Sequence, residues 1–207
     1  MRQLGEYQVK ILAVLSFAQI LGAASAPSPP PTPAPGVLVC LERIAQASTR
    51  TTYLAQLETS KLLARAAVRA EWIHGSTCQS SAAIRVHLTV QTPDNLLPGA
   101  LAFCQPMAGD DIRVLYDRVQ ALVSTAHEPH LLAYILAHEI AHILEGTGRH
   151  SATGIMKAQW TPEDYADIAS GKLTFTSEDI ELVHGGVIVR QAHLNAPAQK
   201  SFTEAIR

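Results

Sequence analysis

Apolar and polar residues follow two different periods along this chain, and the change of period divides it into two parts. In the first part, the apolar run of residues 36–44 predicts a strand, and leucines and alanines at helical spacing predict a helix over residues 49–68. Further strands are expected at residues 68–74, 83–91, 100–104 and 111–119. A strand, a helix and four more strands indicate a mixed sheet with a helix covering one of its faces.

The second part of the chain is predicted to be helical. Eleven of the fourteen residues 131–144 are apolar, and a run of this length is more typical of a buried core helix than of a membrane span. Pro129 suits the start of that helix, and Gly146 suits the position just past its end. Residues 161–169 and 176–193 each begin with a hydroxyl cap followed by acidic residues, which indicates two more helices.

The amino-terminal segment is not expected to belong to the fold. Residues 1–26 resemble a signal peptide, because two basic residues precede an apolar run that ends in small residues, with cleavage favoured after Ala24. Residues 27–36 hold six of the twelve prolines and predict a semi-rigid linker. We therefore expect export to the periplasm or the exterior, and a single domain over residues 37–207 with no stable membrane span.

Composition limits the partners of this domain. The formal net charge is −2 and the sequence pI is about 6.5, so nothing indicates a nucleic acid or an anionic membrane surface as partner. Hydrophobic residues make up 47% and charged residues 16%, a composition typical of a globular protein rather than of a disordered one. A monomer that binds no nucleic acid is expected.

Three cysteines leave the disulfide pattern open. In an oxidising compartment one pair can bridge, and the sequence permits all three pairings. We favour Cys78–Cys104, because Cys40 lies inside an apolar run predicted to be a strand. The alternative, in which all three thiols are reduced and buried, stays open.

The chemistry of the chain is concentrated in the apolar helix. Its strongly polar side chains are His138, Glu139 and His142, and the two histidines lie one turn apart on the same face. Burying them costs several kcal/mol unless a partner satisfies them, and a zinc ion does so with neutral imidazole nitrogens. Glu139 lies about 100° around the helix from His138, beside the open side of such an ion. There it can act as a general base without being a ligand.

The stretch HEIAHILEGTGRHSATGIM, residues 138–156, resembles the metal-binding motif of the metzincin zinc metallopeptidases. It is particularly similar to the matrixin type, in which the third histidine is followed by serine and soon afterwards by a methionine-containing turn. Upstream, GALAFCQPMAGDDIRV is similar to the matrixin edge strand and the strand beside it. The resemblance implies an α+β, zincin-like fold: a mostly parallel five-stranded sheet with an antiparallel edge strand, a covering helix, a buried active-site helix and a helical carboxy-terminal part.

The resemblance also implies roles for individual residues. His138, His142 and His150 would bind Zn²⁺, Glu139 would be the general base, and Met156 would form the hydrophobic floor under the metal. The edge strand, Leu101 to Cys104, would pair with an extended peptide or protein substrate. Trp160 and Tyr165 are interpreted as packing residues rather than as substrate-stacking groups.

The spacing departs from the family motif. Two more residues separate His142 from the third histidine, and Glu145 stands where the motif has glycine. A gluzincin-type site would instead take its third ligand from Glu163, although the first turn of a helix favours an acidic residue without any metal.

The sequence therefore predicts a secreted zinc metalloendopeptidase that hydrolyses peptide bonds through a zinc-bound water activated by Glu139. Two alternatives are kept: a catalytically idle, zinc-containing domain that binds peptides, and a gluzincin-type peptidase with Glu163 as the third ligand.

Overall fold

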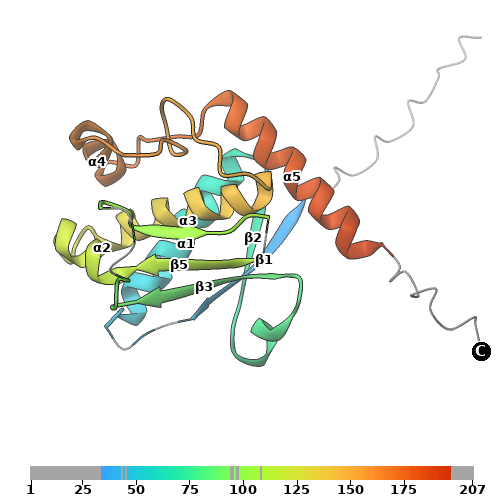
Figure 1. Ribbon diagram of the computed structural model, residues 1–207, viewed down its shortest axis with the longest axis horizontal. Helices are drawn as coiled ribbons and strands as arrows, with labels where there is room; N and C mark the ends of the chain where they lie inside the picture. Colours follow the sequence, from blue (N-terminus) through green and yellow to red (C-terminus); the bar gives the residue numbers. More distant parts are fainter. Residues whose placement is uncertain are drawn as a thin grey trace, which may run out of the picture. The chain divides into compact units, whose positions relative to one another are not determined.

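A computed structural model describes residues 34–42, 44, 46–93, 96, 98–107 and 109–196 (Figure 1). The predicted signal peptide and most of the predicted proline-rich linker lie outside the described residues. One compact unit contains the described part of the chain.

The sheet has five strands in the order β2-β1-β3-β5-β4. Their bounds are Gly36–Glu42 for β1, Arg69–Ile73 for β2, Ala83–Thr89 for β3, Ala102–Cys104 for β4 and Asp111–Leu115 for β5. β1 pairs in parallel with β2 and β3, β3 pairs in parallel with β5, and β4 runs antiparallel to β5 at the edge. The predicted fold class, a mostly parallel mixed sheet with an antiparallel edge strand, is confirmed.

Helices α1 (Thr49–Arg65) and α3 (Glu128–Glu145) pack against each other beside the sheet (Figure 1). Between α3 and the end of the described chain lie α4 (Pro162–Ala169) and α5 (Ser177–Asn195). Both begin with a capping box, in which a threonine and an aspartate three residues later bond to each other's backbone amides. Fifteen of the eighteen residues of α3 are buried, so this helix forms the centre of the core.

One predicted strand is too long. Residues 111–119 were expected to form a single strand, but the strand stops at Leu115 and helix α2 (Tyr116–Leu122) follows. Tyr116 and Val119 are both fully buried, and their spacing of three places them on one face of a helix. The Tyr116 hydroxyl also donates a hydrogen bond of 2.6 Å to the buried Glu128 at the start of α3, which fixes the helix against the core.

The favoured disulfide is wrong: Cys40 bridges Cys78, with the two Cα atoms 5.4 Å apart, and Cys104 is free. The reason is the sheet register. Cys40 lies opposite Ile73 at the end of β2, and the short 3₁₀ helix Gly75–Gln79 that follows carries Cys78 back to it. Because an apolar strand can hold a disulfide on one of its faces, the apolar surroundings of Cys40 were no argument against pairing.

No helix within the described residues is both long and apolar enough to cross a bilayer. A disulfide persists in oxidising surroundings, so the Cys40–Cys78 bridge is compatible with export.

Candidate metal centre

Helix α3 carries His138, Glu139 and His142, the first three residues of the site. Its carboxy-terminal end is closed by Gly146 in the left-handed conformation (φ 65°), whose amide donates to the His142 carbonyl over 3.0 Å. Glu139 and His142 are 7% and 5% exposed, so both polar side chains are buried. Buried polar groups of this kind require partners.

The Nδ1 atoms of both histidines have such partners. His138 Nδ1 lies 2.8 Å from the Ile155 carbonyl oxygen, and His142 Nδ1 lies 3.0 Å from the Thr147 carbonyl oxygen. A carbonyl oxygen only accepts, so both Nδ1 atoms must carry the proton and donate it. In a neutral imidazole the other nitrogen, Nε2, then has a free lone pair.

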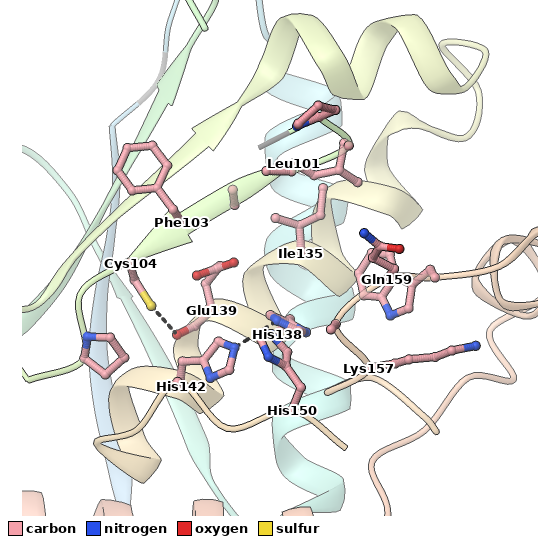
Figure 2. A pocket seen from close by; sticks show the side chains of 18 of the residues that line it. Leu101, Phe103, Cys104, Ile135, His138, Glu139, His142, His150, Lys157 and Gln159 are labelled. Carbon is pink, nitrogen blue, oxygen red and sulfur yellow. Dashed lines mark hydrogen bonds between the residues drawn. The ribbon is translucent and has the colours of Figure 1, made fainter. Parts of the chain in front are cut away.

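Those two lone pairs face each other. The Nε2 atoms of His138 and His142 are 3.0 Å apart, at hydrogen-bond distance, yet neither neutral ring has a proton to place between them (Figure 2). Burial lowers the pKa of both imidazoles to about 4, so at neutral pH no proton is gained either. Two converging acceptors need a cation between them, which is the arrangement that a metal ion satisfies.

His150 completes the group from the loop that follows α3. One nitrogen from each of His138, His142 and His150 lies within 4.8 Å of the others, and among the described residues these form the one such group that can hold a metal ion. Tetrahedral ligands 2.0–2.1 Å from a zinc ion lie roughly 3.3 Å from one another, and the Nε2 atoms of His138 and His142 are 3.0 Å apart. His150 is the exposed member, so the group opens toward solvent on its side.

The turn containing Met156 contacts the histidine group through the Ile155 carbonyl oxygen. The Ser151 amide donates to the Met156 carbonyl over 2.8 Å, and the Ile155 amide donates to the Thr174 carbonyl over 3.0 Å. Met156 is fully buried. Because the Ile155 carbonyl also accepts the His138 proton, this turn sets the orientation of one of the three imidazoles.

Gly154 gives a test of how tightly that turn is held. Its φ is +78°, and a Cβ there would lie 2.5 Å from the Thr174 carbonyl oxygen. We expect Gly154→Ala to lower the free energy of unfolding of the metal-free protein by at least about 2 kcal/mol, because strain and overlap add. Gly148→Ala is the matched control, since nothing lies within 4 Å of its added Cβ, and it should change stability by less than about 0.5 kcal/mol. Denaturant unfolding with equal effects for both variants would contradict this account of the turn.

Glu139 is placed next to the histidines but is not one of the group. Figure 2 shows it on the side that faces Phe103 and Cys104 of the edge strand. Burial raises the pKa of its carboxyl group to about 7, and a nearby cation would lower that pKa again. Cys104 points its thiol at the Glu139 carbonyl oxygen, 3.9 Å away, and burial raises the pKa of that thiol far above its usual range.

A cleft of about 610 Å³ opens over the three histidines and Glu139. One wall is residues 98–104, which include edge strand β4, and the opposite wall is residues 157–160. Ile135 of α3 and Tyr165 of α4 also line it. Trp160 stacks edge-on against both His138 and Tyr165, with ring centroids 6.0 and 6.2 Å apart.

Sequence reasoning placed most of these residues and missed others. Glu163, the alternative third ligand, lies exposed in the first turn of α4, outside the histidine group and outside the residues that line the cleft. Trp160 and Tyr165 pack against the core, as predicted, but they also line the cleft. Asp179 of α5, fully buried beside the loop that carries His150, had no signal in the sequence beyond its place in a capping box.

No protein-family model matches this chain, and no characterised protein matches its sequence. The function must therefore be inferred from the site itself. The described residues establish three histidines, on a helix and the loop after it beside a mixed five-stranded sheet, that can hold a metal ion.

Proposed function

We propose that this chain is an exported zinc metalloendopeptidase of the metzincin type, with a matrixin-like site and a lengthened loop before its third ligand. The observation that carries the proposal is the convergence of three imidazole nitrogens next to a buried glutamate at the base of a cleft. A metal site without catalysis would need the histidines but would have no use for Glu139 in that position. The proposal includes removal of the signal peptide, residues 1–26.

His138, His142 and His150 would hold the ion. Three neutral imidazoles are a donor set that suits zinc, and three protein ligands leave one tetrahedral position open, as catalytic zinc sites require. When bound, zinc supplies Lewis-acid chemistry, lowering the pKa of water and polarising a carbonyl. The two hydrogen bonds from Nδ1 atoms to backbone carbonyls fix ring orientation and make the ligands more basic.

Glu139 would move the proton. One carboxylate oxygen accepts a proton from the water that attacks the scissile carbonyl, and the carboxylic acid then donates this proton to the amide nitrogen that leaves. The buried position, 7% exposed, suits this role, because burial raises the pKa of the carboxyl group and so makes its carboxylate a stronger base than an exposed one. Glu139 lies on the same helix as two of the ligands, so α3 fixes the position of the general base relative to these ligands.

The substrate would be an extended peptide. Within the described part of the chain, edge strand β4 pairs with β5 alone, which leaves one side of the strand open for pairing, and the residues of β4 line the cleft. A peptide that adds to this edge gains main-chain hydrogen bonds without regard to its side chains. Leu101, Ile135 and Trp160 line the cleft and give it apolar surface for one side chain of the peptide.

The test is cleavage of a peptide library by the zinc-loaded domain, residues 37–207, analysed by mass spectrometry. We expect internal peptide bonds to be cut, and cleavage to stop when a chelator removes the metal and to return when zinc is restored. Zinc-dependent retention of intact peptides without cleavage would support the peptide-binding alternative instead. Cleavage that persists unchanged in the chelated protein would contradict the proposal.

A further inference from the structure

The loop that carries His150 is tied to helix α5 through one buried atom. Arg149, the residue before His150, donates from Nη2 to Asp179 Oδ1 over 2.7 Å. Ser151, the residue after His150, donates its hydroxyl proton to the same oxygen, and Arg149 Nη1 donates to Ser151 Oγ over 3.1 Å. The backbone on both sides of His150 is therefore held by a single carboxylate oxygen.

Asp179 is itself rigidly placed. It is fully buried, and its other oxygen, Oδ2, accepts the Thr176 amide over 3.0 Å in the capping box of α5. Burial raises the pKa of Asp179, but the hydrogen bonds from Ser151, Thr176 and Arg149 outweigh burial and hold the pKa below its usual value. The carboxylate is thus a fixed anion at the start of a long helix.

A second buried carboxyl group lies near the Arg149 guanidinium, and burial raises the pKa of this group, Glu145, to about 7. The Glu145 side chain, at the end of α3, is 1% exposed, and its Oε2 lies 3.9 Å from Arg149 Nε. Neither oxygen of Glu145 accepts a hydrogen bond from the described residues, so the Arg149 cation is its nearest counter-charge. Glu145 stands where the family motif has glycine, and Arg149 lies within the lengthened loop, so both belong to this chain's departure from the motif.

We propose that Arg149, near the buried carboxyl groups of Glu145 and Asp179, is a positioning residue that holds His150 in place for the metal. The inference rests on the proposed metal site and deepens it. A longer loop has more conformations, and a histidine at its end would reach the metal in only a fraction of them. The ties from Arg149 and Ser151 to Asp179 restrict that freedom, and they replace the short glycine turn with a charged clamp.

Arg149→Met tests the clamp, because methionine keeps an apolar stem and removes every hydrogen bond of the guanidinium. The probe is Co²⁺ bound to the metal-depleted domain, with affinity measured by chelator competition and ligand geometry by visible absorption. We expect Co²⁺ affinity to fall about 10–100-fold and the absorption bands to shift toward those of His150→Ala. Arg149→Lys keeps the charge near Asp179 but lacks the planar fork with which the guanidinium donates to Asp179 and Ser151, so it should recover part of the loss.

Arg190→Met is the matched control. Arg190 lies on α5, the helix that carries Asp179, and donates to Asp110 over 2.6 Å and to the Ala82 carbonyl over 3.1 Å, so it ties the helix to the residues just before β5 and β3 and not to the loop that carries His150. The Arg190→Met variant should be less stable than wild type but should keep its Co²⁺ affinity within about 3-fold of wild type.

The outcomes separate the two proposals. Wild-type protein that binds no Co²⁺ would overturn the metal site and the clamp together. Wild-type protein that binds Co²⁺, with an Arg149→Met variant of unchanged affinity and spectrum, would overturn the clamp alone, even if that variant were less stable. If Arg149→Met does not fold, Arg149→Gln decides, because it is polar but carries no charge, and wild-type affinity and spectrum in that variant would overturn the inference.

Discussion

Glu139→Gln is expected to abolish peptide cleavage while the zinc content stays at the wild-type level. Glutamine keeps the shape of the buried side chain but cannot accept a proton from water, and loss of a general base costs at least about 10²–10⁴-fold in rate. The ligands are untouched, because Glu139 is not one of the three groups that converge on the metal position. The measurement is kcat/KM on the best peptide from the library, together with zinc content for each preparation.

Glu128→Gln is the control for removing a buried charge from the same helix. Glu128 is 5% exposed and accepts a hydrogen bond from Tyr116, at the end of α3 opposite the metal site. This variant should keep kcat/KM within a few-fold of wild type. Near wild-type cleavage by Glu139→Gln would show that the mechanism is wrong, even if the metal site is right.

His150→Ala is expected to lower zinc affinity by at least about 100-fold, since losing a ligand costs more than losing an outer-shell partner. Glu163→Gln should leave affinity within a few-fold, because Glu163 lies exposed in the first turn of α4 and a bond to a backbone amide holds its pKa below the usual value. That is the behaviour of a helix-start carboxylate. Chelator competition with both variants in parallel provides the measurement. The reverse ranking would move the protein to the gluzincin type.

The sequence was informative wherever a function depends on residues close together in the chain. His138, Glu139 and His142 could be placed on one buried helix because a period of 3.6 residues and an apolar background suffice for that inference. The resemblance to the matrixins implied that β4 lies at the edge of the sheet and that the other strands run parallel to one another. Both expectations are confirmed.

Features that depend on distant residues could not be predicted in the same way. The pairing of Cys40 with Cys78 follows from the register of β1 against β2, which no local pattern encodes. Helix α2 begins inside an alternating stretch because Tyr116 finds its partner on α3. Asp179 is one of the acidic residues that mark the start of the helix predicted over residues 176–193. Its contacts with Arg149 and Ser151 arise only because α5 packs against the loop that carries His150.

The central claim is that three histidines hold one zinc ion, and metal content tests it most directly. The domain, residues 37–207, should be purified without chelators or affinity resins that carry metal, and analysed by inductively coupled plasma mass spectrometry. The account predicts one zinc per chain, with removal of the ion lowering the midpoint of thermal unfolding, because the Nε2 atoms of His138 and His142, 3.0 Å apart, would lose their partner. Well under half a zinc per chain, with no uptake when zinc is added back, would contradict it.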